Sequence, residues 1–213
     1  MKKQLLSILF TVLILAGAFS IGNADTFRFD TDPFAGSTAL TTPGRQVVGG
    51  EDSITFDIAS DIFSLESTVF NAGNQVLFAN NVVGNLPTSG VNVIVLQTFD
   101  NDADLGTPFL AGNAANLIAG QITSPGAGFF IYFNSVLDLP RLVYSTDLDD
   151  NTADLKVLFR MTNLAGQGGR DLIPTFQESN FEITTVPEPG TILLLSAGLI
   201  GLAGYARKRL ILE

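Results

Sequence analysis

Apolar side chains recur at every second position along much of the central chain. In segment 155–161 this spacing predicts one apolar face made of Leu155, Val157, Phe159 and Met161. A period of two is typical of β-strands, because successive side chains point to opposite faces of a sheet. Turn-forming Gly, Asn, Asp and Pro separate the runs, as expected for many short strands. The runs are Ser53–Ile58, Gln75–Ala79, Val91–Phe99, Phe129–Phe133, Arg141–Thr146, Leu155–Met161 and Phe181–Val186.

Short strands with two apolar faces predict a mainly β fold, and we expect an antiparallel β-sandwich. Antiparallel pairing is the simplest expectation, because most connections leave little room for crossover helices. The abundant Phe residues are expected in its core, since they alternate within the strands.

Segment 110–122 is the exception to the strand pattern. Its apolar residues fall on one helical face, which comprises Leu110, Ala114, Leu117, Ile118 and Ile122. We therefore expect one short helix packed against the sheets, with Gly120 at or near its end. Segment 166–169 is glycine-rich but lacks the Lys-Ser/Thr pair of a phosphate-binding loop, so we interpret it as a turn between strands.

The N-terminal segment 1–24 is typical of a secretory signal peptide. Lys2 and Lys3 precede an uncharged apolar run, and Gly22-Asn23-Ala24 supplies small residues before Asp25. We predict cleavage by signal peptidase after Ala24, with Ala18 as the alternative site. An uncleaved N-terminal anchor is the other interpretation, although the apolar run is shorter than the roughly 20 residues that a spanning helix needs.

A second uncharged apolar segment lies near the C-terminus. It covers residues 190–206 and is followed by the basic cluster Arg207, Lys208 and Arg209. A helix of this length measures roughly 25 Å, which is enough to span a slightly thinned membrane. We predict one transmembrane helix at about 190–206, with the basic cluster in the cytoplasm and the body outside.

A Pro-Glu-Pro box precedes this segment, within Val186-Pro187-Glu188-Pro189. Each proline fixes φ and biases the residue before it toward an extended conformation, so the box is expected to be accessible to a processing enzyme. The box, the apolar span and the basic cluster together resemble the PEP-CTERM sorting signal. The resemblance implies recognition by an exosortase-type membrane enzyme of a Gram-negative bacterium, which removes the anchor and passes the body to the cell envelope or extracellular matrix. An unprocessed single-span anchor is the alternative.

These signals divide the chain into a signal peptide (1–24), a β-rich extracellular domain (25–185) and a sorting segment (186–213). The chain has a formal charge of −10, which argues against nucleic acid as a partner. It contains no Cys or His, so disulfides, Ser-His-Asp triads, Cys nucleophiles and the usual zinc ligand sets are excluded.

Two acidic clusters are candidate calcium sites, and calcium is the one cofactor that the sequence suggests. Asp100, Asp102 and Asp104 begin like an EF-hand loop, but Leu105 and Ala111 occupy the positions that need Gly and Glu. Asp147, Asp149 and Asp150 form the second cluster, between two expected strands. The alternative for both clusters is an exposed, solvated turn, since Asp and Asn stabilise turns by bonding their own backbone.

The expected function is therefore non-enzymatic: a structural or adhesive component of the cell surface or exopolysaccharide matrix. One alternative is an extracellular glycan-active enzyme, for which the clusters could supply paired carboxylates. The other is a binding module for polysaccharide, calcium or ice.

Overall fold

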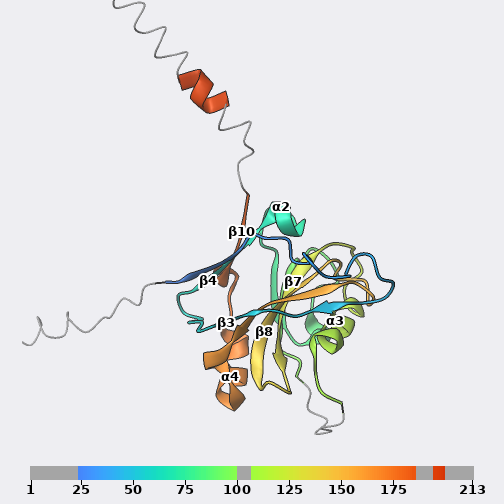
Figure 1. Cartoon of the computed structure of the whole chain (residues 1–213). Coiled ribbons are helices and arrows are strands. Elements are labelled where there is room, and N and C mark those ends of the chain that lie inside the picture. The colour runs from blue at the N-terminus through green and yellow to red at the C-terminus, as the bar shows by residue number, and fades with distance from the viewer. Residues whose placement is uncertain (1–23, 100–106, 186–193, 200–213) are drawn as a thin grey trace, which may run out of the picture.

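The computed structural model of the chain describes residues 24–99, 107–185 and 194–199, and its body contains two β-sheets (Figure 1). The three-stranded sheet has the order β1 (Thr26–Phe29), β4 (Ile62–Glu66), β10 (Phe181–Thr184). The seven-stranded sheet has the order β2 (Val47–Val48), β9 (Leu155–Met161), β8 (Leu139–Ser145), β7 (Gly128–Asn134), β6 (Val93–Leu96), β5 (Phe78–Asn81). β3 (Asp52–Ile54) also pairs with β9.

The fold is mainly β, but the expectation of antiparallel pairing is wrong for most of it. Among the strands of the described residues, only the β7–β8 and β8–β9 pairs are antiparallel. All three strands of the smaller sheet run parallel, as do the β5–β6 and β6–β7 pairs. Parallel neighbours need long crossover connections, and irregular segments with short helices provide them here. One such helix is α3 (Ala111–Ala119), which connects β6 to β7.

The larger sheet buries side chains on both of its faces. The first cluster, here called the inter-sheet core, packs the two sheets together and includes Phe63, Leu65, Phe129, Ile131, Phe133, Phe159 and Phe181. The second cluster, the helix-side core, includes Ile94, Phe130, Tyr132, Val157, Ala114 and Ile118. Phe56 and Phe63 stack with ring centroids 4.3 Å apart. The expected Phe-rich core is therefore confirmed, and each fully buried Phe contributes roughly 1.5–3 kcal/mol.

Strand β7 follows the alternation that the sequence predicts, whereas β9 departs from it. Leu142 pairs with Phe159 and Val143 pairs with Val157, so Leu158 has no opposite residue and forms a bulge. Before the bulge, Val157 packs in the helix-side core, whereas Phe159 beyond it packs between the sheets. The prediction that residues 155, 157, 159 and 161 share one face is therefore wrong.

The expected helix in segment 110–122 is confirmed as α3, although two residues of its predicted apolar face are not fully buried. Ala114 and Ile118 are buried, whereas Leu110 is 41% exposed. α2 (Ser67–Phe70) and α4 (Gly166–Leu172) were not expected. The 3-10 turns were not expected either; they are η1 (Val83–Asn85), η2 (Thr162–Leu164), η3 (Ile173–Thr175) and η4 (Glu178–Asn180).

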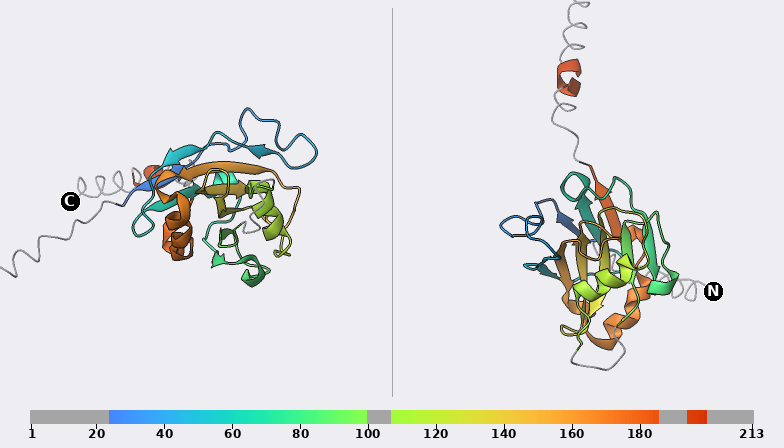
Figure 2. Two further views of the ribbon diagram at one scale, coloured as in Figure 1. Left: turned by 90° about the horizontal axis from the view of Figure 1, so that it is seen from below. Right: turned by 90° about the vertical axis from the view of Figure 1, so that its right-hand side faces the viewer.

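The glycine-rich segment 166–169 begins α4 and is not the expected turn between strands. Gly169 is buried here, and a Cβ atom at this position would lie 1.6 Å from the carbonyl oxygen of Leu164. Glycine at position 169 therefore lets the first turn of α4 approach the backbone of Leu164 closely. α3 and α4 lie apart from each other (Figure 2).

Candidate functional site

The expected sorting segment begins directly after the smaller sheet. β10 is an edge strand that pairs with β4 and ends at Thr184, and Thr185 is exposed. The end of β10 lies at the surface of the body (Figure 1). Val186, Pro187, Glu188, Pro189 and the basic cluster Arg207, Lys208 and Arg209 lie outside the described residues. The sorting segment thus follows directly from an edge strand at the surface of the body.

Six residues of the apolar tail, 194–199, are described, and they are helical. Leu194, Leu195 and Leu199 are 76%, 65% and 60% exposed, so the body does not bury them. The rest of the expected transmembrane segment 190–206 lies outside the described residues. In the described parts of the chain, no helix has the length and apolar character needed to cross a membrane.

Comparison with known families identifies this tail. Residues 185–209 match the family model described as the PEP-CTERM protein-sorting motif. The chain therefore carries a PEP-CTERM motif, which implies exosortase-dependent export and sorting toward the envelope or the outside of the cell. Comparisons of the chain with curated proteins and with solved structures give no match.

At the other end, residues 1–23 of the expected signal peptide lie outside the described residues. Ala24 is exposed and stands two residues before β1. The residue that follows the expected cleavage site is therefore already part of the folded body.

The acidic cluster at 147–150 lies in the loop between β8 and β9, where its carboxylates bond nearby backbone. Asp147 Oδ1 accepts hydrogen bonds from the backbone nitrogens of Gly126 (2.8 Å) and Asp149 (3.2 Å). Asp150 Oδ1 accepts bonds from the backbone nitrogen (2.7 Å) and Oγ1 (2.8 Å) of Thr152. These bonds stabilise turns in the way expected for Asp in loops.

The carboxylates of this cluster have different electrostatic surroundings. Partial desolvation, together with the charge and hydrogen bonding of Asp147, raises the pKa of Asp149. The two bonds from Thr152 lower the pKa of Asp150. Within residues 24–99, 107–185 and 194–199, no group of three or more acidic side chains is placed to hold a metal ion. Asp100, Asp102 and Asp104 lie outside those ranges, and calcium binding stays a prediction.

Arg45, which the sequence did not single out, ties the 147–154 loop to α3. Its Nε donates to the carbonyl oxygen of Ala153 (3.0 Å), and its Nη1 donates to Gly112 O (2.8 Å) and Asn116 Oδ1 (2.7 Å). Burial lowers the pKa of Arg45, and the charges of Asp150 and Asp154 partly offset this effect. Arg45 thus connects the loop to α3, although the loop, α3 and Arg45 are distant from one another in the sequence.

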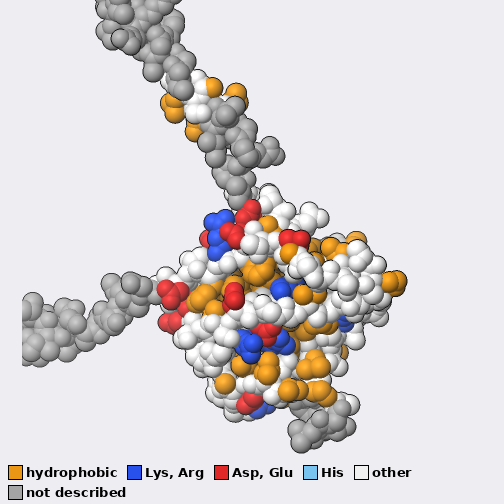
Figure 3. Space-filling view, viewed as in Figure 1, with side chains coloured by type: hydrophobic (Ala, Val, Ile, Leu, Met, Phe, Trp, Pro, Cys, Tyr) orange, Lys and Arg blue, Asp and Glu red, His pale blue; other side chains and the backbone are white. Residues whose placement is uncertain are grey.

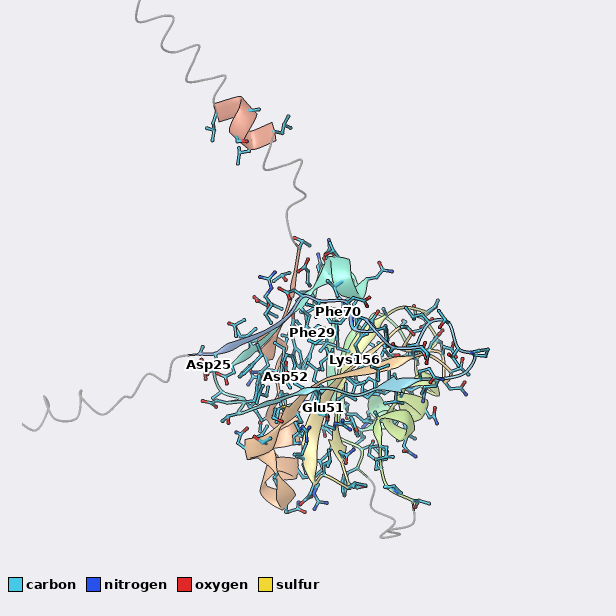
Figure 4. All side chains as sticks on the ribbon, viewed as in Figure 1. Asp25, Phe29, Glu51, Asp52, Phe70 and Lys156 are labelled. Carbon is cyan, nitrogen blue, oxygen red and sulfur yellow. The ribbon has the colours of Figure 1, made fainter. Side chains whose placement is uncertain are left out.

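A second charged cluster missed from the sequence comprises Glu51, Arg141 and Arg160. The two arginines lie directly opposite each other on β8 and β9, and like charges in such a pair are destabilising. Glu51 compensates, because it accepts a hydrogen bond from Arg141 and its Oε1 lies 3.7 Å from Arg160 Nε. Basic and acidic side chains gather in the middle of the face shown in Figure 3, and Figure 4 labels Glu51.

A surface hollow of about 340 Å³ is lined by several amide side chains, including those of Asn71, Asn74, Gln75 and Asn92. Asn92 is buried, and its Nδ2 donates hydrogen bonds to Ala72 O (2.7 Å) and Gln75 O (2.8 Å). Its Oδ1 accepts a hydrogen bond from Leu77 N (2.8 Å). Asn71, Asn74 and Gln75 are exposed. The clustering of amides around Gly73 was the sequence signal that could have revealed this hollow.

Proposed function

We propose that the mature body is a non-enzymatic structural or adhesive component of the cell surface or exopolysaccharide matrix. In this account, signal peptidase removes residues 1–24 and the tail anchors the precursor in the inner membrane. An exosortase-type enzyme then processes the tail and the body passes outward. The observation that carries the proposal is the PEP-CTERM motif, which begins at residue 185, immediately after β10.

Two further features support this role for the body. The sequence contains no His or Cys, so a nucleophile that depends on either residue is excluded. The exposed amides of the 340 Å³ hollow supply both donors and acceptors for the hydroxyl groups of a polysaccharide. We therefore place matrix contact at Asn71, Asn74 and Gln75.

The sorting step is tested by replacing both prolines of the box, Pro187→Ala and Pro189→Ala. We expect unprocessed precursor to accumulate in the membrane fraction, because the enzyme loses its extended recognition segment. Glu178→Gln, at an exposed position upstream of β10, is the matched control and should be processed normally. Normal processing of the double-proline variant would contradict the proposed use of the motif.

The matrix role is tested with purified exopolysaccharide from the native cell surface. Asn74→Ala and Gln75→Ala should weaken co-sedimentation with the polysaccharide, whereas Asn85→Ala, at another exposed amide, should not. Release of reducing ends during the incubation would instead favour the glycan-active enzyme. A rise of the melting temperature (Tm) with millimolar calcium, reversed by chelation, would support the calcium-binding alternative.

A further inference from the structure

Asp61 is a buried carboxylate, with only 4% of the residue exposed. Its Oδ1 accepts hydrogen bonds from Asp25 N (2.9 Å) and Ser60 Oγ (3.2 Å), and its Oδ2 accepts one from Asp57 N (2.8 Å). In the described parts of the chain, the ion pairs of Lys and Arg involve other carboxylates. A buried carboxylate is costly unless a positive charge pairs with it.

The backbone nitrogen of Asp25 is an unusual partner for this carboxylate. Asp25 is the first residue after the predicted cleavage site, and it lies at the edge of the body where β1 begins (Figure 4). Its carbonyl oxygen accepts a hydrogen bond from Ile62 N (3.0 Å). Both backbone groups of Asp25 are therefore fixed against the 61–62 segment.

The segment that carries Asp61 is itself held firmly. Asp61 N donates to Asp57 O (2.8 Å), which closes a turn. The amide of Asn180, a buried residue, donates to Asp61 O (3.0 Å) and Ile58 O (2.8 Å). The backbone that carries this carboxylate is thus held by contacts that do not involve Asp25.

We propose that Asp61 is a receptor for the α-ammonium group that signal peptidase creates on Asp25. This inference rests on the proposed export and on cleavage after Ala24. Water is added across the Ala24–Asp25 peptide bond, so Ala24 leaves with a carboxylate and the Asp25 nitrogen becomes an amine that takes up a proton. A neutral donor with one hydrogen is thereby replaced by a cation with three.

Cleavage after Ala24 is therefore expected to stabilise the start of β1. Cleavage adds the attraction between two opposite charges to a hydrogen bond that previously had a neutral donor, and this attraction is stronger away from bulk water. Within the described residues, β1 is an edge strand of the smaller sheet and pairs with β4 alone, so the start of this strand is a place where the sheet would otherwise fray.

The test compares chains with defined N-termini in the same detergent at pH 6, where an α-amino group is protonated. One chain spans residues 25–213, and the other spans 23–213 and so moves the ammonium group away from Asp61. We expect the chain that begins at Asp25 to have a Tm higher by about 2–4 °C. Acetylation of its α-amine should abolish the difference, and so should Asp61→Asn in both chains.

Amide hydrogen exchange provides a second readout if Asp61→Asn folds poorly. The amides of Phe27 and Phe29 should exchange more slowly in the chain that begins at Asp25 than in its acetylated form. Equal Tm values and equal exchange rates for the two unmodified chains would overturn the proposal. The N-terminal residue of the native protein tests the cleavage site separately: a native start other than Asp25 would refute the predicted cleavage, whatever the melting result.

Discussion

Gly168 and Gly169 are neighbours in α4, yet only one of them has room for a side chain. An added Cβ would meet no atom within 4 Å at Gly168, whereas at Gly169 it would overlap the Leu164 carbonyl. We expect Gly169→Ala to lower the free energy of unfolding by about 3 kcal/mol, because the backbone of η2 would have to shift. Gly168→Ala should be neutral or stabilise by up to about 1 kcal/mol. Urea denaturation of both variants checks this, and equal stabilities would contradict the close approach.

The ionisation of Glu51 should contribute to the stability of the protein in acid. Burial alone would raise its pKa, but its backbone hydrogen bond and the charges of Arg141 and Arg160 outweigh burial and lower it. A lowered folded-state pKa stabilises the protein above the usual Glu range, and the stabilisation is lost as the pH falls through the folded pKa.

The corresponding variant is Glu51→Gln, which leaves the two opposed arginines uncompensated. We expect it to cost about 1–3 kcal/mol at pH 7 and less at pH 3, because the stabilisation by ionised Glu51 is lost as the pH falls through its folded-state pKa. Thermal denaturation at both pH values measures the difference, with the exposed Glu178→Gln as control. A loss of stability that is the same at both pH values would show that the charge of Glu51 is not its source.

At the scale of elements, the sequence predicted those parts whose pattern is local. The alternation in β7 and the apolar face of α3 both follow from the spacing of neighbouring residues. β4 was missed, although all but one of its residues are buried, because two of the buried residues, Ser64 and Glu66, are polar and interrupt the apolar pattern. The direction of pairing was wrong for another reason: a strand's own residues do not specify which distant strand lies beside it.

The functional residues also comprise some that a local sequence pattern reveals and some that only distant contacts reveal. The Pro-Glu-Pro box and the basic cluster form a contiguous pattern that can be read directly. Asp61 lies in a polar turn, and its buried environment depends on contacts with Asp25 and Asn180, each of which is distant in the sequence. A sequence pattern alone cannot separate such a carboxylate from those of the acidic loop at 147–150.

The junction made by Arg45 leads to a prediction for the 147–154 loop. Arg45→Ala removes bonds to Ala153, Gly112 and Asn116, and we expect a loss of about 1–3 kcal/mol with faster amide exchange in this loop. Asn85→Ala is the control, because Asn85 is exposed and surface substitutions usually change stability little. Unchanged exchange in Arg45→Ala would mean that the loop is held by its own turns.

For the whole molecule, the smaller sheet determines where the chain enters and leaves the body. β1 and β10 flank β4 and run parallel to it, so the first residue of β1 and the last residue of β10 lie at opposite ends of the sheet. The two points are roughly 13 Å apart along the strand direction, and β4 lies between their strands. Both expected processing segments therefore adjoin one small sheet, and we expect cleavage at either end to leave the larger sheet folded.

The central claim is that both apolar ends are delivery signals and that the folded body acts outside the cytoplasm. Intact-mass analysis of the native protein, combined with cell fractionation, tests it most directly. The account predicts a chain that begins at Asp25, lacks the basic cluster Arg207–Arg209 and is recovered from the envelope or extracellular fraction. Recovery of the complete chain from Met1 to Glu213 in the cytosol would contradict it.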